Sequence, residues 1–324
     1  MSAFSNESFS HEVCAEEALP FSAVAQRLGD QRISNRRNDM AEILCSTGAL
    51  IGKANNRDYH LLQKLAGQLQ CDGYEFMVYS SWYEEWEILA DYLAGLNLHI
   101  PVVHADKRIG EFISQGEDVA QADGEAAVKF QINCELARRI GAKVLVIHLW
   151  GGMASDRDFD NHLRAYPILR DIADGYGLDL LVENVVCNRE NPMKHLCQLA
   201  KENPEIGFVW DTKMAAFHQE ETLLYQQDYA WLWQQGHIRH YHVNDYGGGY
   251  MDWGSTIGKA VLPMGAGHID FDAFFRFIQR TGYDGSYTVE ATAFDSDGSV
   301  DVEMLNRCFE HIREGITKKF NKQI

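Results

Sequence analysis

Short apolar segments of β type alternate with longer amphipathic segments from about residue 40 to the end of the chain. Strands that are apolar along their whole length are buried on both faces, and helices between them connect them in parallel. The alternation therefore predicts an α/β fold in which helices cover a parallel sheet. The predicted strands are 42–51, 73–79, 100–106, 144–150, 179–185, 207–211, 238–245 and 286–291.

The number of strand and helix units favours a closed (β/α)8 barrel, the TIM-barrel architecture, which takes roughly 250 residues. An open, doubly wound sheet is the main alternative. The first strand lacks the G-x-G-x-x-G turn of dinucleotide-binding sheets, which argues against the usual form of that alternative. We expect one barrel domain over residues 38–324. A short N-terminal extension, residues 1–37, is expected to form a helix and a connector that pack against the barrel or a neighbouring subunit, so a homo-oligomer is left open.

The composition argues against several classes of partner. The chain of 324 residues has 47 acidic against 29 basic side chains, a net charge of -18, which repels nucleic-acid backbones and anionic membranes. No apolar run reaches the roughly 20 residues of a membrane helix, and the N-terminal segment lacks the pattern of a secretory signal. Seven scattered cysteines without a C-x-x-C pair fit reduced thiols. These observations predict a cytoplasmic protein that binds neither nucleic acid nor membranes.

Four acidic or imidazole side chains lie at or near the carboxyl ends of predicted strands: Glu183 in LLVEN, Asp211 in FVWDT, His242 in HYHVND and Glu290 in YTVEA. The strand ends of a barrel converge on one mouth, so residues far apart in the sequence meet there. Carboxylate oxygens with one imidazole nitrogen suit Mn²⁺, Mg²⁺, Co²⁺ or Zn²⁺, and the absence of a thiolate argues against a structural zinc site. The pattern predicts a ligand set for one divalent metal ion.

Other polar residues fall near the same level of the predicted barrel. His104 and His148 could support the metal ligands, bind substrate or hold a second metal ion. Glu75 is expected to hold another polar group in place. His240 should lie one layer deeper than His242, because the two residues share a face of one strand.

The motifs VEN, WDT, HVND, MGAGHIDF and GYDGSYTVEA, in that order, resemble those of the xylose-isomerase-like superfamily of barrels. The superfamily contains sugar and sugar-phosphate isomerases and epimerases, ketose 3-epimerases of the tagatose type, inosose dehydratases and the apurinic endonuclease IV group. The resemblance covers about residues 40 to 318. It implies that Glu183, Asp211, His242 and Glu290 bind one divalent metal ion.

The same resemblance implies a catalytic role for Glu183 and Glu290, which would lie on opposite faces of a bound ketose and exchange a proton with its carbon. The chemistry supports this independently. Removal of a proton beside a carbonyl requires a base close to the carbon and a cation that holds the enediolate oxygens.

This sequence departs from the pattern of the epimerases at three positions, where Met214, Arg189 and Gly248 replace a histidine, a glutamate and an arginine. The endonuclease group also needs a histidine at position 214, and an Asp-x-His where Lys259 and Val261 stand. Together with the charge of -18, these differences disfavour DNA repair.

We therefore expect a divalent-metal-dependent isomerase or epimerase of a small sugar or polyol-derived carbonyl compound, acting through an enediolate. One alternative is a metal-dependent dehydratase of the inosose or dehydroshikimate type, which would expel a β-hydroxyl from the same intermediate. A barrel that binds a sugar without turnover is a further alternative. The lack of a phosphate-binding motif favours an unphosphorylated substrate.

Candidate substrate contacts surround the predicted metal site. His104, His148 and Lys213 could orient hydroxyl groups, although Lys213 could equally be a solvated lysine at the start of a helix. Trp150 and Trp210 could form an apolar wall for the carbon face of a sugar, with core packing as the alternative.

Overall fold

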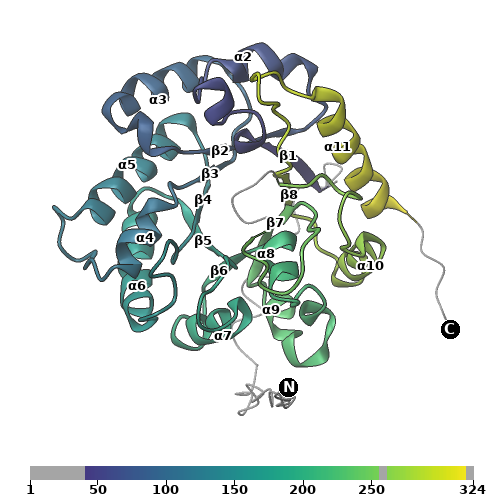
Figure 1. Cartoon of the computed structure of the whole chain (residues 1–324). Helices are drawn as coiled ribbons and strands as arrows, with labels where there is room; N and C mark the ends of the chain where they lie inside the picture. Colours follow the sequence, from purple (N-terminus) through teal and green to yellow (C-terminus); the bar gives the residue numbers. More distant parts are fainter. Residues whose placement is uncertain (1–40, 255–260, 319–324) are drawn as a thin grey trace, which may run out of the picture.

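The computed structural model describes residues 41–254 and 261–318 and confirms the predicted fold. Eight parallel strands pair in chain order into a closed barrel, and helices surround it in a ring (Figure 1). The predicted N-terminal extension, residues 1–37, lies outside the described residues. The strands are β1 (Glu42–Ser46), β2 (Gly73–Met77), β3 (Val102–His104), β4 (Val144–Ile147), β5 (Asp179–Glu183), β6 (Gly207–Asp211), β7 (Ile238–Val243) and β8 (Ser286–Val289).

The helices of the ring differ in length, and the longer ones bury one face against the strands. Glycines in the left-handed conformation end two of them, Gly141 with φ 84° and Gly282 with φ 68°. The α-helices are α2 (Leu61–Leu65), α3 (Trp86–Gly95), α4 (Arg108–Ser114), α5 (Glu125–Ile140), α6 (Asp160–Gly175), α7 (Pro192–Glu202), α8 (Thr212–Phe217), α9 (Trp231–Gln234), α10 (Phe271–Thr281) and α11 (Val302–Thr317). Short 3-10 turns are η1 (Thr47–Ala49), η2 (Lys53–Asn55), η3 (Ala66–Gln68), η4 (Ser80–Glu85), η5 (Leu223–Tyr225) and η6 (Gln227–Tyr229).

Most strands end earlier than their apolar runs predict. The largest difference is at β1, which was expected over 42–51 but ends at Ser46. The hydroxyl of Ser46 accepts a hydrogen bond from the Gly48 amide, and the Ile51 amide donates to the Thr47 carbonyl at 2.8 Å. These local bonds turn the chain out of the sheet, and the apolar residues that follow pack under the loop instead.

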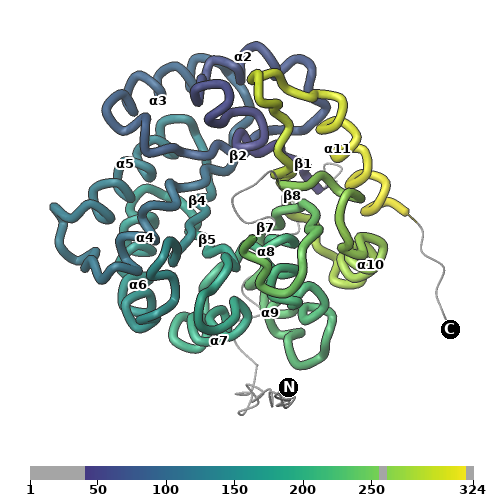
Figure 2. Tube along the Cα trace, viewed as in Figure 1, coloured from purple at the N-terminus to yellow at the C-terminus, as the bar shows by residue number. Residues whose placement is uncertain are grey.

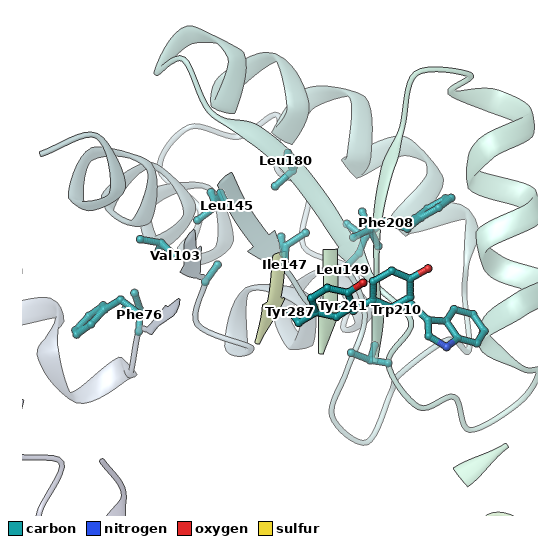
Figure 3. Close-up of a cluster of buried hydrophobic side chains, with 14 of the residues drawn as sticks. Phe76, Val103, Leu145, Ile147, Leu149, Leu180, Phe208, Trp210, Tyr241 and Tyr287 are labelled. Carbon is teal, nitrogen blue, oxygen red and sulfur yellow. The ribbon is translucent and has the colours of Figure 1, made fainter. Parts of the chain in front are cut away.

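Strand alternation divides the apolar core into two layers. Outward residues such as Phe208, Trp210 and Tyr241 pack between the strands and the helices, where the rings of Tyr241 and Tyr287 stack (Figure 3). The inner layer is small, and its fully or almost fully buried members are Leu44, Val102, Val146, Leu181 and Val209. Small β-branched and aliphatic residues thus fill the lower part of the barrel interior and leave its carboxyl end to polar groups.

The last helix completes the ring beside the first strands (Figure 2). Arg313 of α11 pairs with Asp72 at 3.0 Å, and Asn306 accepts from the Gln70 amide at 2.8 Å. Among the described residues, no helix combines the length and apolar character needed to cross a bilayer. The six cysteines in this part of the chain are all free thiols, in agreement with the expectation of reduced cysteines.

Candidate metal centre

Each strand of the barrel places a polar residue on the inside, near or just beyond its carboxyl end in every strand except β2, where Glu75 is the third of five residues. Period-two alternation fixes this arrangement, because residues one position away from these groups face the outer core layer. All of the predicted metal ligands belong to this inner ring. Its members are Ser46, Glu75, His104, His148, Glu183, Asp211, His242 and Glu290.

The four predicted ligands come together around the ring of His242. Its Nδ1 lies 3.5 Å from Oε1 of Glu183, 4.0 Å from Oδ2 of Asp211 and 3.6 Å from Oε1 of Glu290. One ligand atom from each of the four residues lies within 4.8 Å of the other three. This spacing suits a single ion bound among them.

Glu75 fixes the orientation of the histidine from the opposite side. Nε2 of His242 lies 3.0 Å from Oε1 of Glu75, which also accepts hydrogen bonds from His240 and Thr288 at its other oxygen. The expectation that Glu75 holds another polar group is confirmed, as is the deeper position of His240. A carboxylate behind a histidine ligand is a common device for fixing the ring and raising its basicity.

Two buried atoms of the cluster have no hydrogen-bond partner among the described residues, Nδ1 of His242 and Oε1 of Glu290. Buried polar atoms are normally paired, and an unpaired one costs about 1 to 3 kcal/mol. Because Nε2 of His242 is occupied by Glu75, Nδ1 is the nitrogen that faces the three other carboxylates. A divalent cation at this point would satisfy both orphaned atoms, so the residues present fit a metal ion.

Asparagines that follow two of the ligands hold Asp211 in place. The side chain of Asn184 accepts from the Asp211 amide at 2.6 Å and donates to the Asp211 carbonyl at 3.2 Å. Asn244 donates to Oδ2 of Asp211 at 3.0 Å, while Oδ1 caps α8 through the Met214 amide at 2.7 Å. The motifs VEN and HVND contain these asparagines, but reasoning from residue type alone assigned them no role.

Two further histidines converge on Glu183. Nε2 of His104 lies 3.1 Å and Nε2 of His148 lies 2.7 Å from the same oxygen, Oε2. Nδ1 of His104 is bonded to the Ala105 carbonyl at 2.9 Å, so His104 offers only Nε2 to the centre. The three residues also form a group with the spacing of metal ligands, and the second-metal alternative therefore keeps a geometric basis.

The charges in the cluster shift the pKa values of its members. Burial alone would lower the pKa of His104, but its hydrogen bond to Glu183 and the charges of Glu183 and Glu75 outweigh burial and raise the pKa to about 9. Burial, with the charge of Glu183, raises the pKa of Asp211 to about 6. Burial also raises the pKa of Glu290. The carboxylates thus repel one another, which is the condition that a bound cation relieves.

His242 responds in the opposite direction. Burial opposes a charged ring, yet the negative charges of Glu75, Glu290 and Glu183 raise its pKa well above the ordinary value. The surroundings that favour a proton on this ring equally favour a metal ion in place of that proton.

The two tryptophans do not line the mouth. Trp150 is 0% and Trp210 is 1% exposed, and both belong to the outer layer of the core. Trp210 points away from the barrel interior (Figure 3), because it alternates with the inward residues Val209 and Asp211. Trp150 packs against the rings of Phe159 and His195. A ring without an exposed face cannot stack on a sugar, so the apolar-wall interpretation is corrected to core packing.

Lys213 lies close to the centre without belonging to it. It is half-buried in the first turn of α8, and its charge lowers the pKa of Asp211 against the effect of burial. The part of the chain that the structure describes offers it no ion-pair partner within 4.0 Å. The glycine-rich segment that follows His242, residues 245–267, lies partly outside the described residues.

A sequence model of the xylose isomerase-like TIM barrel matches residues 64–308. The chain belongs to the xylose isomerase-like TIM-barrel family. The match includes all four predicted metal ligands and the residues that support them. No curated protein sequence matches the chain.

Solved structures of this family type share the fold at low identity. An IolI protein with a bound zinc atom has a TM-score of 0.63 and 17% identity, and the likeness covers 86% of this chain and 99% of that chain. An L-ribulose 3-epimerase has a TM-score of 0.57 and 16% identity, and the likeness covers 86% of this chain and 95% of that chain. A D-allulose 3-epimerase from Methylomonas sp., solved with D-allulose, has a TM-score of 0.56 and 16% identity, and the likeness covers 85% of this chain and 97% of that chain. At such identities the likeness demonstrates the fold.

Proposed function

We propose that the protein is a divalent-metal-dependent isomerase or epimerase of a small polyhydroxy carbonyl compound. The observation that carries the proposal is the convergence of Glu183, Asp211, Glu290 and Nδ1 of His242, with two buried atoms left unpaired. Family membership supports an enzyme of the sugar isomerase and epimerase type. Mn²⁺, Mg²⁺, Co²⁺ and Zn²⁺ all suit this donor set.

Glu290 is the candidate base that faces the substrate. Its side chain is 11% exposed, whereas those of Glu183 and Asp211 are at most 1% exposed, so Glu290 is the carboxylate that a ligand in the mouth can reach most directly. Burial raises its pKa, which makes the carboxylate a stronger base towards a carbon-bound proton. Glu290 therefore removes or returns the proton beside the carbonyl.

Glu183 acts at the opposite side with the help of two histidines. Its Oε2 contacts His148, whose side chain is 20% exposed and can exchange protons with a bound ligand. Burial raises the pKa of Glu183, but the charges of His148 and His242 and the hydrogen bonds of His104 and His148 outweigh it and lower the pKa well below the ordinary value. The metal ion, when bound, supplies polarisation of the carbonyl and compensation of negative charge.

His148 also gives the dehydratase alternative a specific basis. The lyase reaction needs an acid that protonates a departing β-hydroxyl, in addition to the base that removes the α-proton. A partly exposed imidazole beside the metal ligands meets that need. The two reactions then share Glu290 and differ in whether the proton returns to carbon or a hydroxyl leaves.

Solvent exchange separates these functions. The metal-loaded protein is incubated in D2O with D-tagatose, D-allulose, L-ribulose, an inosose and dehydroshikimate, and the products are analysed by NMR and ultraviolet absorbance. Deuterium at a carbon beside the carbonyl supports isomerase or epimerase chemistry, whereas a conjugated chromophore supports the dehydratase. A protein that binds metal and ligand without exchange or elimination would instead be a non-catalytic barrel.

The variant Glu290→Gln tests the assignment of the base. It keeps the size of the side chain and removes its basicity, so exchange should fall by about 100-fold or more. Glu310→Gln, on the exposed face of α11, is the matched control and should retain full exchange. Normal exchange by Glu290→Gln would remove its role. A metal-bound crystal structure in which the four ligands do not share one ion would overturn the metal site itself.

A further inference from the structure

A cavity of about 380 Å³ adjoins the candidate metal centre on the side of β2, β3 and β4. His104 and His148, the two partners of Glu183, form its inner wall. Tyr79 also lines the cavity, and the negative charge of Glu290 acts on its hydroxyl group. A ligand that reaches the metal centre from this side therefore occupies the cavity.

Four basic residues line this cavity, in two pairs from two loops. Lys53 and Arg57 follow β1, and Lys107 and Arg108 follow β3. None of the four forms an ion pair within 4.0 Å in residues 41–254 and 261–318. Elsewhere basic side chains commonly pair with a neighbouring acid, as Arg138 does with Glu135.

The acidic residues of the cavity do not neutralise these charges. Asp106 and Glu111 are the two that line it. Both oxygens of Asp106 are occupied, one by the Ser80 hydroxyl at 2.6 Å and the other by the Arg108 amide at 3.1 Å. Four cations against two carboxylates give an excess of positive charge in a chain whose net charge is -18. The local charge is thus opposite in sign to that of the whole protein.

Arg57 is held in place by an unusual local backbone. Asn56 and Arg57 both have positive φ angles, 58° and 53°, a region that costs non-glycine residues about 1 kcal/mol or more. The Arg57 amide donates to the Gly52 carbonyl at 2.8 Å, and its carbonyl accepts from the Trp82 indole at 3.2 Å. These bonds fix the residue despite the strain.

The side chain of Arg57 is also positioned. Its guanidinium lies 4.9 Å from the centre of the Tyr79 ring, a cation-π contact that orients the plane of the group. Its Nε is buried and has no hydrogen-bond partner among the described residues. A planar guanidinium with an unused buried donor at the wall of a cavity is suited to an anionic oxygen group.

We propose that the ligand of this site carries an anionic group, a carboxylate or a phosphate, which Arg57 binds with the help of Lys53, Lys107 and Arg108. This inference rests on the proposed function in that the remainder of the ligand, a short polyhydroxy chain, extends towards His104, His148 and the metal centre. The substrate is then an acidic or phosphorylated sugar derivative rather than a neutral ketose. No sequence motif marks this property, because the cations come from two separate loops.

Three four-carbon polyols that differ only at one end test the proposal: erythritol, D-erythronate and D-erythritol 4-phosphate. Binding to the metal-loaded full-length protein is measured by isothermal titration calorimetry. At least one of the two anions should bind tenfold or more tightly than erythritol, and the tighter anion identifies the charged group as carboxylate or phosphate. Added salt should weaken the binding of that anion and leave the binding of erythritol unchanged.

Variants connect the preference to the cavity. Arg57→Gln and Lys107→Gln should each reduce the preference for the anion by about tenfold. Lys143→Gln is the matched control, since Lys143 is an exposed lysine before the amino end of β4, at the other end of the barrel, and it should keep the full preference. Arg57→Lys retains the positive charge and should keep part of the preference for the anion. This variant provides a second test in case Arg57→Gln fails to fold.

Equal affinity for all three polyols would overturn the proposal, as would equal losses in Arg57→Gln and Lys143→Gln. None of the three compounds has an aldehyde or ketone group, so their binding is measured without turnover. An anion preference in a protein that exchanges no deuterium into neutral ketoses, ketose phosphates or keto-acid sugars would therefore disprove the enzymatic function and leave the anion site standing. Exchange with neutral ketoses in a protein without an anion preference would support the enzymatic function and overturn the anion site.

Discussion

Oε1 of Glu75 lies 3.0 Å from Nε2 of His242, while the other ring nitrogen, Nδ1, faces the carboxylates of Glu183, Asp211 and Glu290. One side of the imidazole is thus committed to a buried carboxylate and the other remains available to a cation. The pair joins β2 to β7 across the interior of the barrel. Glu75 is therefore a positioning residue for the predicted metal site.

The variant Glu75→Gln should lower the affinity for the metal ion by about 10- to 100-fold, because the amide no longer fixes the ring or raises its basicity. Competition with a fluorescent chelator measures the affinity. Glu42→Gln is a matched control, since Glu42 also contacts a histidine, His99, at 2.7 Å, but at the opposite end of the barrel. Unchanged affinity in Glu75→Gln would show that the contact does not support the metal site.

Removal of the metal ion should destabilise the protein. Three carboxylates and a histidine would then remain buried together without a cation. The size of the effect follows from mass action, because a ligand present at 1,000 times its dissociation constant stabilises the folded state by about 4 kcal/mol. Differential scanning calorimetry before and after treatment with a chelator should show a lower Tm. Asp211→Asn preserves the cap of α8 but loses a ligand, so its Tm should respond little to the chelator. Identical Tm values for the treated and untreated wild type would contradict the metal site.

Gly110→Ala should destabilise the wall of the mouth. A Cβ at Gly110 of α4 would lie 2.1 Å from the carbonyl oxygen of His148, and a backbone atom cannot move away cheaply. We expect a loss of about 1 to 3 kcal/mol in the free energy of unfolding, measured with urea. Gly95→Ala is the control. A Cβ at Gly95 would have no atom within 4 Å among the described residues, and the change should stabilise α3 by roughly 0.5 kcal/mol. Equal effects of the two substitutions would refute the steric argument.

The stability of the protein should depend on pH through Glu220. Burial raises the pKa of this carboxyl group to about 8. The folded state therefore binds a proton that the unfolded state releases near pH 4.5, so the stabilising contribution of this group is fully present below that pH and is lost as the pH rises towards 8. Glu220→Gln should resemble the wild type at pH 5 and exceed it at pH 8.5 by on the order of 3 kcal/mol. Glu310→Gln, exposed on α11, should keep the pH dependence of the wild type. If the free energy of unfolding of Glu220→Gln varied with pH in the same way as that of the wild type, Glu220 would not be protonated in the folded protein.

The architecture and the convergence of the four predicted ligands were accessible from the sequence, because both depend on period and strand position. Glu183, Asp211, His242 and Glu290 each stand at or next to the end of an apolar run, and the eightfold repeat requires such ends to meet. Glu75 could be read as a support because it occupies an inward position of an apolar strand, where an acid needs a partner. Local patterns were sufficient in each of these cases.

Other features depend on contacts that no local pattern contains. Trp210 is adjacent to Asp211 in the sequence but faces the opposite side of the sheet, and alternation would have placed it in the core had it been applied strictly. The cations of the cavity stand in loops, Arg57 in one with two positive φ angles, and their common position becomes visible only when β1 and β3 are placed around the barrel. The strand ends were overestimated because apolar residues beyond Ser46 pack beneath a loop.

The pairing of β1 with β8 has a consequence for the order in which the protein matures. Glu290 follows the last strand, so the chain order places the other three predicted ligands, Glu183, Asp211 and His242, before it. The four predicted ligands come together only when β8 has paired with β1 and closed the barrel. A chain truncated before β8 would therefore lack Glu290 and, with it, one of the four predicted ligands, as well as the strand that closes the barrel against β1.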